Sequence, residues 1–305
     1  MITIYDIEIC DCHHHLWDLQ ANYYPWLTDT KRSRVCGEYE AIRHKNFLVE
    51  DFFHNRGDLK VTRFIHEEAV IDRSDPVRET RWLQGLADDL KSEGVPHGIV
   101  AHADFSSSDI EEILEGHCSF ANMRGIRQFV HEAYIDPENP EPCLLEEASW
   151  RERVGLCEKY NLVFDLQFYW QQLPDALKLV KLHPNLQFVL THIGLPARQD
   201  DRDYMQGWRT SMQQMGEQSN LCVKLSGFGM FDRNWTPESI RHLVLDTIGY
   251  FGVDRCLFAS NFPVDSLSGK SYVSYWEDFY EVVKDFSDDE KRMLFSENAR
   301  RVYRV

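Results

Sequence analysis

The sequence lacks the features that mark several large classes of protein. Its 33 Lys and Arg residues face 50 Asp and Glu residues, and the resulting net charge of −17 repels phosphate backbones, which argues against a nucleic-acid partner. No apolar run approaches the roughly 18 residues of a membrane span. The segment Met1–His15 has neither the basic start nor the apolar core of a signal peptide. We therefore expect a cytoplasmic protein that binds neither nucleic acid nor a membrane.

The sequence also lacks any C-x-x-C pair, although it has eight cysteines. This absence argues against a cysteine-based zinc site and against a disulfide framework, so we expect reduced cysteines that serve mainly in packing. Pro, Gly and Ser nowhere gather into a linker. Residues 1–305, of which 43% are hydrophobic, are therefore expected to form one domain with a substantial core.

Short apolar runs alternate along the chain with longer, charged stretches of helical period. This alternation predicts a (β/α)8 TIM barrel, an α/β fold, with a doubly wound parallel sheet as the alternative. The stretch Leu16–Phe53 has no clean period and is expected to form a long loop after the first strand. The expected strands are Tyr5–His13, Leu59–His66, Gly98–Ala103, Met123–Val130, Leu162–Leu166, Gln187–Thr191, Leu221–Leu225 and Arg255–Ala259. The expected helices are Val77–Ser92, Ser107–Glu115, Leu145–Lys159, Leu173–Leu182, Tyr204–Gln218, Pro237–Phe251, Tyr272–Asp285 and Asp288–Tyr303.

Three adjacent histidines stand where the first expected strand ends. Alternation along a strand directs His13 and His15 to one face and His14 to the other. Two imidazoles side by side are suited to bind a divalent metal or to donate hydrogen bonds to a substrate oxygen. The alternative is that the histidines only form hydrogen bonds within the loop.

Further histidines lie at or near the ends of other expected strands. His192 follows the sixth strand, and His66, His102 and His131 lie near the ends of the second, third and fourth. Because the carboxyl ends of barrel strands meet at one mouth, we expect these side chains to converge there.

Several residues near strand ends are candidates for binding a substrate. Arg127 offers paired donors for a substrate carboxylate or hydroxyl, and the alternative is a salt bridge with an acidic residue. Lys224, in the seventh expected strand, either points into the barrel, where burial forces it to pair or to lose its proton, or lies at the surface. Further candidates to line a pocket are His66, Glu68, Gln167, Tyr169 and Trp170.

Five short blocks follow one another along the chain and carry a family resemblance. They are His13-x-His15 with Leu16-Trp17, Gly125-Ile126-Arg127, Thr191-His192-Ile193-Gly194, Val223-Lys224-Leu225-Ser226-Gly227 and Ser260-Asn261-Phe262-Pro263. With them the sequence resembles the amidohydrolase superfamily, in particular its amidohydrolase-related branch of sugar-lactonases and 2-pyrone-4,6-dicarboxylate lactonase. The resemblance implies a barrel hydrolase that uses a His-x-His pair, a sixth-strand histidine and an eighth-strand carboxylate.

His13, His15 and His192 match the three histidine positions of that pattern, but the carboxylate position departs from it. Asn261 stands there, and an amide can neither take up a proton as a general base nor supply the charge of a metal ligand. Asp265, four residues on, is the alternative carboxylate. The three histidines could hold one divalent metal, most readily zinc. The lactonase branch also includes enzymes that look metal-independent, so both modes stay open.

These features together favour a hydrolase that acts on a small-molecule substrate. The first hypothesis is a lactonase that opens a sugar-derived or carboxylated lactone by adding water to its carbonyl, with a catalytic set of His13, His15, His192, Asn261 and Asp265. A second is a related decarboxylase or hydratase, because Asn261 suits a site that activates no water in the usual way. A third is a catalytically silent barrel that binds a ligand. The chain is compatible with a monomer or a homodimer.

Overall fold

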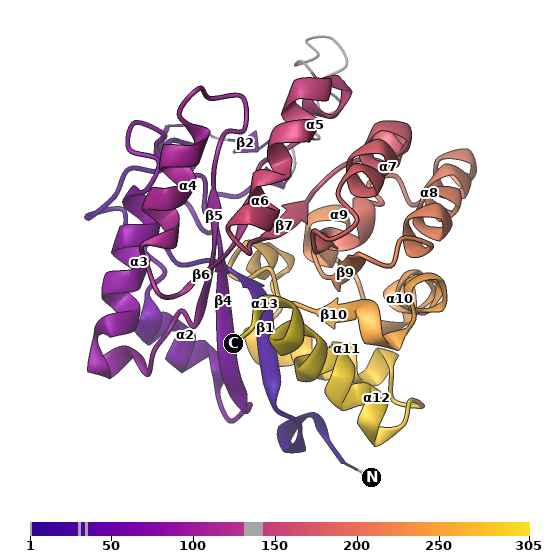
Figure 1. Cartoon of the computed structure of the whole chain (residues 1–305). Helices are drawn as coiled ribbons and strands as arrows, with labels where there is room; N and C mark the ends of the chain where they lie inside the picture. Colours follow the sequence, from indigo (N-terminus) through magenta and orange to yellow (C-terminus); the bar gives the residue numbers. More distant parts are fainter. Residues whose placement is uncertain (1, 30–31, 34–35, 131–142) are drawn as a thin grey trace.

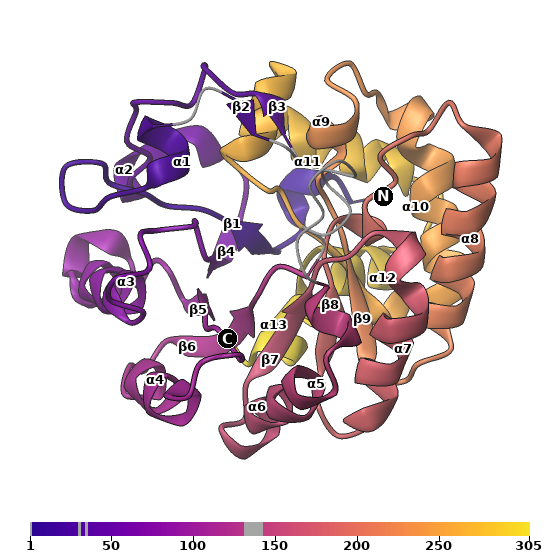
Figure 2. The ribbon, with the colours of Figure 1, turned by 90° about the horizontal axis from the view of Figure 1, so that it is seen from above.

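Eight parallel strands form the centre of the molecule, and they follow one another around the sheet in chain order (Figure 2). The computed structural model describes residues 2–29, 32–33, 36–130 and 143–305. The order is β1-β4-β5-β6-β7-β8-β9-β10, and each strand pairs in parallel with the next. The bounds are β1 Ile9–His14, β4 Val61–Glu67, β5 Gly98–His102, β6 Met123–Arg127, β7 Val163–Leu166, β8 Phe188–Leu190, β9 Leu221–Leu225 and β10 Cys256–Phe258.

Backbone contacts just beyond the last strand bring the sheet round to its first strand. The Asn261 N–H donates to the carbonyl oxygen of His13 at 2.8 Å, and the His15 N–H donates to that of Phe262 at 2.8 Å. His14 and Phe262 also form an isolated parallel bridge. The nearly closed sheet confirms the predicted (β/α)8 barrel and rules out the doubly wound alternative.

Helices surround the barrel on its outside (Figures 1 and 2). They are α2 Val49–Arg56, α3 Arg78–Asp88, α4 Ile110–Cys118, α5 Ala148–Val154, α6 Leu156–Lys159, α7 Leu173–Leu182, α8 Arg202–Gly216, α10 Pro237–Phe251, α11 Tyr272–Val282 and α12 Asp288–Arg292, whereas α13 Asn298–Tyr303 lies at one end of the barrel. The predicted bounds of the helices at 173–182 and 237–251 are confirmed. The second of these begins with Thr236 as the N-cap and Pro237 in the first turn. Within the described ranges, no helix is long and apolar enough to cross a membrane.

The C-terminal helix α13 closes the end of the barrel opposite the mouth. Ala299, Val302 and Tyr303 pack in one buried cluster with residues that line the barrel interior, among them Cys10, Ile65, Val100, Val163, Val189 and Cys222. A Cβ atom on Gly98, at the start of β5, would lie 3.3 Å from the side chain of Val305. The last residues of the chain therefore form the floor of the barrel.

The structure corrects several predicted boundaries. The fourth strand ends at Arg127 rather than Val130, and the helix predicted over 145–159 is divided into α5 and α6. The first strand begins at Ile9 rather than Tyr5, because residues 4–6 form a 3-10 turn. The segment 16–53 is not wholly loop: it contains α1 (Pro25–Thr28) and the short strands β2 (Arg32–Ser33) and β3 (Gly37–Glu38), and α2 begins within it. Helix α2 shows no apolar stripe, since it buries only Val49 and Phe52. The helix expected over 288–303 is interrupted by a π turn at 293–297.

Candidate active site

Three histidines meet at the carboxyl ends of the strands. The ring centroid of His13 lies 5.1 Å from that of His15 and 4.5 Å from that of His192. All three side chains are at most 5% exposed. His14 instead packs on the other side of the strand, against Phe47 and Phe64. The structure thus brings together the three histidines that the sequence singled out, from strands that are distant in the chain.

Close packing fixes the position of His192. Its backbone and that of Ile193 have φ values of 52° and 47°, so the chain makes a left-handed turn directly after β8. Its Nδ1 atom lies 3.0 Å from Ser226 Oγ. A Cβ atom on Gly227 would lie 2.7 Å from the same Nδ1 atom, and Gly227 itself has a φ of 78°. Only glycine fits at that position, which explains the Ser-Gly pair that follows β9.

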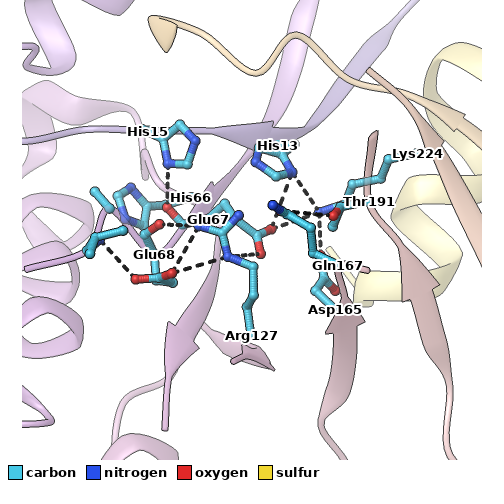
Figure 3. Close-up of polar contacts among 12 residues, drawn as sticks. His13, His15, His66, Glu67, Glu68, Arg127, Asp165, Gln167, Thr191 and Lys224 are labelled. Carbon is cyan, nitrogen blue, oxygen red and sulfur yellow. Dashed lines mark hydrogen bonds and ion pairs between the residues drawn. The ribbon is translucent and has the colours of Figure 1, made fainter. Parts of the chain in front are cut away.

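Beneath the histidines, Lys224 holds two carboxylates inside the barrel (Figure 3). Its Nζ atom lies 2.8 Å from Glu67 Oε2 and 2.5 Å from Asp165 Oδ2, and all three side chains are fully buried. The Tyr303 hydroxyl donates to the Asp165 carboxylate, with 2.8 Å to each oxygen. Glu67 Oε1 is also 3.2 Å from Arg127 Nε. We call Lys224, Glu67, Asp165, Arg127 and Tyr303 the floor lattice.

The electrostatics of the floor lattice follow from its burial. Burial by itself would lower the pKa of Lys224, but Asp165 and Glu67 raise it above its ordinary value, so the ammonium persists. Burial, with the Asp165 charge added to it, raises the pKa of Glu67 to about 8. Lys224 was expected either inside the barrel or at the surface, and the structure places it inside. Glu67, Asp165 and Tyr303 were missed, although a charged residue between apolar neighbours of a strand was an available signal for Asp165.

The ammonium of Lys224 also determines where His13 carries its proton. Nζ lies 3.4 Å from His13 Nδ1, and an ammonium can only donate. Burial first, and then the Lys224 charge, keep the pKa of His13 well below its ordinary value, so the ring is neutral. Glu67 Oε2 also faces Nδ1 but lies 3.7 Å away, beyond hydrogen-bond distance, so the nearer ammonium assigns the single proton to Nε2. In the described part of the chain this Nε2 atom is buried without a hydrogen-bond partner.

Arg127 and Glu68 form a tight pair beside the lattice. Arg127 Nη2 donates to the carbonyl oxygen of Glu68 at 2.6 Å and to its Oε1 at 3.0 Å. Glu68 Oε2 accepts from Arg73 at 3.0 Å and from the Val70 N–H at 2.9 Å. Although burial acts the other way, the two guanidinium groups hold the pKa of Glu68 well below its usual range. A carboxylate that is held so firmly is a poor proton acceptor, so Glu68 acts to position Arg127.

At the eighth strand, Asn261 lies between His15 and Asp265. Its Oδ1 atom is 3.3 Å from His15 Nε2, and its Nδ2 atom is 2.9 Å from Asp265 Oδ1. His15 Nδ1 lies 2.8 Å from the carbonyl oxygen of Glu67. Asp265 is fully buried behind Asn261, and this burial raises its pKa to about 7. The two eighth-strand candidates are thus in direct contact, with Asn261 on the histidine side.

The remaining predicted residues have more varied surroundings. Gln167 Oε1 accepts from Thr191 Oγ1 at 3.1 Å, which joins the ends of β7 and β8. Trp170 is half-buried, and its Nε1 atom has no hydrogen-bond partner among the residues that can be placed. His66 Nδ1 accepts from the Leu16 N–H at 3.1 Å, so His66 anchors the first loop. His102 ends β5, and His131 lies outside the described residues.

The donor set does not fit a zinc site in this arrangement. Zinc needs about three protein ligands aimed at one point. Within residues 2–29, 36–130 and 143–305, no three His, Cys, Asp or Glu side chains form such a group. His13 Nδ1 faces an ammonium, and His15 Nε2 faces an amide. Metal binding by His13, His15 and His192 stays a prediction, and the chemistry below uses the chain's own groups.

Comparison with known proteins agrees with this fold and with the predicted resemblance. A family model described as amidohydrolase matches residues 10–305. The uncharacterised protein y4mH of Sinorhizobium fredii is 40% identical over 98% of this chain and 99% of its own length. L-fucono-1,5-lactonase of Burkholderia multivorans is 24% identical, over 96% of this chain and 95% of its own. An amidohydrolase structure from Burkholderia multivorans with bound zinc superposes with a TM-score of 0.79 at 22% identity, covering 97% of this chain and 99% of that one. Because the family model spans almost every residue, this chain belongs to the amidohydrolase family.

Proposed function

We propose that the protein is a lactonase, which adds water to the carbonyl of a sugar-derived or carboxylated lactone. The observation that carries the proposal is the buried, unpartnered Nε2–H of His13 within the described residues, beside two further histidines at the barrel mouth. A donor buried without a partner is costly, so it is suited to a ligand atom that completes it. The 24% identity to an L-fucono-1,5-lactonase supports the same class of substrate.

His13 is assigned to the lactone carbonyl oxygen. Its Nε2–H donates to that oxygen, and the hydrogen bond strengthens as the oxygen becomes an oxyanion. The Lys224 ammonium at Nδ1 keeps the proton on Nε2 and adds positive potential behind the ring. The donor is held in place before the reaction, because Lys224 is itself held by Glu67 and Asp165.

His192 is assigned as the proton acceptor for the attacking water. In this assignment Nδ1 donates its hydrogen to Ser226 Oγ, and the lone pair of Nε2 is left to accept the proton. Water adds to the carbonyl carbon while His192 takes one of its protons. The tetrahedral intermediate then collapses, the ring C–O bond breaks, and His192 returns the proton to the leaving alkoxide. The product is a hydroxy acid, which ionises and releases one proton to solution.

The other predicted residues are assigned to substrate orientation and support. Gln167 and Trp170 follow β7 at the mouth and offer polar groups to the hydroxyls of a small sugar ring. Arg127 is directed by Glu68 and Glu67 and orients the substrate through its remaining donor capacity. His66 keeps the first loop in place.

Proton release from a panel of aldono-lactones and pyrone-carboxylic lactones, in weakly buffered indicator solution, tests the proposal. Rapid acidification with one lactone, abolished in a His192→Asn variant, is the expected result. The panel is run with and without added zinc, so that the same assay measures any metal requirement. Absence of acidification with every lactone under both conditions contradicts the proposal.

A decarboxylase or hydratase is the second candidate, because Asn261 replaces the carboxylate expected at the eighth strand. A lyase of this kind needs no water activated by that carboxylate. Carbon dioxide release from aromatic or enoic acids, with no acidification from lactones, is the result that favours it.

A further inference from the structure

His15, Asn261 and Asp265 form two consecutive side-chain contacts, and the donor and acceptor of each contact can be assigned. The three side chains are at most 5% exposed, so water contributes little to their hydrogen bonds. Each contact therefore needs one donor and one acceptor.

The backbone carbonyl of Glu67 determines which ring nitrogen of His15 carries the proton. Nδ1 lies 2.8 Å from the Glu67 backbone carbonyl, which can only accept, so Nδ1 carries the hydrogen. The ring is buried, and its described hydrogen-bond partners are a backbone carbonyl and an amide rather than a carboxylate, so nothing there offsets the cost of a second proton and the ring is neutral. His15 Nε2 is therefore an acceptor and needs a donor from Asn261.

Asn261 meets this need only if its NH2 group faces His15. The oxygen and nitrogen of an amide have nearly the same size, so rotation by 180° about the last side-chain bond fills the same space. In that orientation the amide oxygen occupies the position 2.9 Å from Asp265 Oδ1. Two acceptors cannot stay at that distance without a proton between them, so Asp265 must be a carboxylic acid.

The surroundings of Asp265 agree with a neutral acid. Its carboxyl is fully buried, and burial raises its pKa to about 7. The groups that favour the ionised form are Asn261, Tyr275 from α11, the Gly229 N–H from α9 (Phe228–Phe231) and the Arg233 charge. The Gly229 contact is long, at 3.4 Å to Oδ2, so it stabilises a carboxylate only weakly.

We propose that Asp265 is a positioning residue that works as a neutral carboxylic acid: it donates to Asn261, which turns the Asn261 NH2 group to His15 and holds that ring at the mouth. The role in turnover rests on the proposed function, whereas the proton on Asp265 does not. When Asp265 ionises, it accepts the Asn261 N–H, and the amide oxygen then faces the lone pair of His15 Nε2. Turnover therefore falls as pH rises through the pKa of Asp265.

Two spectroscopic measurements test the proton positions without any substrate. Long-range ¹H–¹⁵N spectra, with His15→Gln to assign the signal, are expected to show His15 protonated at Nδ1. Infrared difference spectra between the wild type and Asp265→Asn are expected to show one protonated carboxyl band in the wild type at about pH 6, lost as pH rises past about 7. An Nε2–H form of His15, or an Asp265 already ionised at pH 6, overturns the proposal.

Two variants then test the role in turnover of whichever substrate the wild type accepts. Asp265→Asn keeps a donor for Asn261, and its kcat is expected to stay within about tenfold of the wild type without the alkaline fall. Asp265→Leu removes the donor, and its kcat is expected to drop about 100-fold. Equal losses in both variants, or an unchanged alkaline fall in Asp265→Asn, overturn the proposal.

Thermal melting of both variants shows whether they fold, and the spectroscopic result stands if Asp265→Leu does not. If the wild type turns over no lactone, the proposed function fails while the proton on Asp265 is still measured. The two failures are thus distinguishable.

Discussion

The floor lattice and the mouth histidines (His13, His15 and His192) lie next to each other in the same barrel, but their buried polar groups differ in how far they are paired. In the floor lattice Lys224 touches two carboxylates, and Asp165 is further held by Tyr303. At the mouth, His13 has a buried Nε2–H that no described residue accepts. Glu67 Oε1 of the lattice has no hydrogen bond within the described residues, but it still has the Arg127 charge beside it. A network of paired charges is rigid, whereas a donor with neither a hydrogen bond nor an opposite charge has free energy left for a ligand. The floor lattice therefore fixes positions, and under the proposed function the histidines above it carry the reaction.

Removing a mouth histidine should give the largest effect on activity. We expect His192→Asn to reduce kcat by about 10²–10⁴-fold, because the water loses its proton acceptor. The unfolding free energy should change little, since His192 is outside the floor lattice. Steady-state proton release and urea unfolding measure the two quantities. Near-normal turnover would remove His192 from the mechanism.

Removing a charge from the floor lattice should have the opposite outcome, with a larger effect on the unfolding free energy than a mouth histidine has. Lys224→Met leaves Glu67 and Asp165 buried without their ammonium, at a cost of about 3–5 kcal/mol in unfolding free energy. Lys178→Met is the matched control, because Lys178 pairs with Asp175 at the surface and should contribute less than about 1 kcal/mol. Equal losses in the two variants, measured by urea unfolding, would contradict the distinction between lattice and surface.

Removing a single hydroxyl from the floor lattice should give a smaller loss of stability than removing Lys224. Tyr303→Phe removes one donor to Asp165 but keeps the ring in the barrel, and should cost about 1.5–3 kcal/mol. Tyr160→Phe, whose hydroxyl lies 3.1 Å from Glu115 at an exposed site, is the control and should cost under about 0.5 kcal/mol. Chemical denaturation measures the unfolding free energy of both variants. If Tyr303→Phe unfolds with the same free energy as the wild type, the floor lattice needs only the aromatic ring and not the hydroxyl.

The pH dependence of stability should show the smallest effect. The pKa of Asp265 is raised to about 7 in the folded state from 3.8, so the folded protein binds the extra proton between these values. The corresponding stability is complete below about pH 4 and is lost as pH rises through about 7, with a slope of at most about 1.4 kcal/mol per pH unit. Asp265→Asn should lack this loss. Asp11 and Glu67, with pKa values raised to about 6 and about 8, titrate in both proteins. Identical pH profiles would contradict a raised pKa at Asp265.

Periodicity and composition were enough to predict the barrel and the approach of its histidines. Eight apolar runs alternate with helical stretches, and this local pattern specifies a parallel sheet with outer helices. Strand alternation placed His13 and His15 together, and the barrel rule brought His192 to the same mouth. Helix α2 was missed because two buried residues make no readable stripe.

Only the tertiary structure decided which groups pair. Lys224 lies 157 residues from Glu67 in the chain, and Tyr303 lies 138 residues from Asp165. Such contacts depend on strand register, on closure of the sheet and on the docking of α13, none of which leaves a local pattern in the sequence. The same is true of the protons on His13 and His15, because a buried imidazole takes the tautomer that its neighbours allow. The sequence by itself therefore determined the scaffold and its reactive residue types, and the packing determined their states.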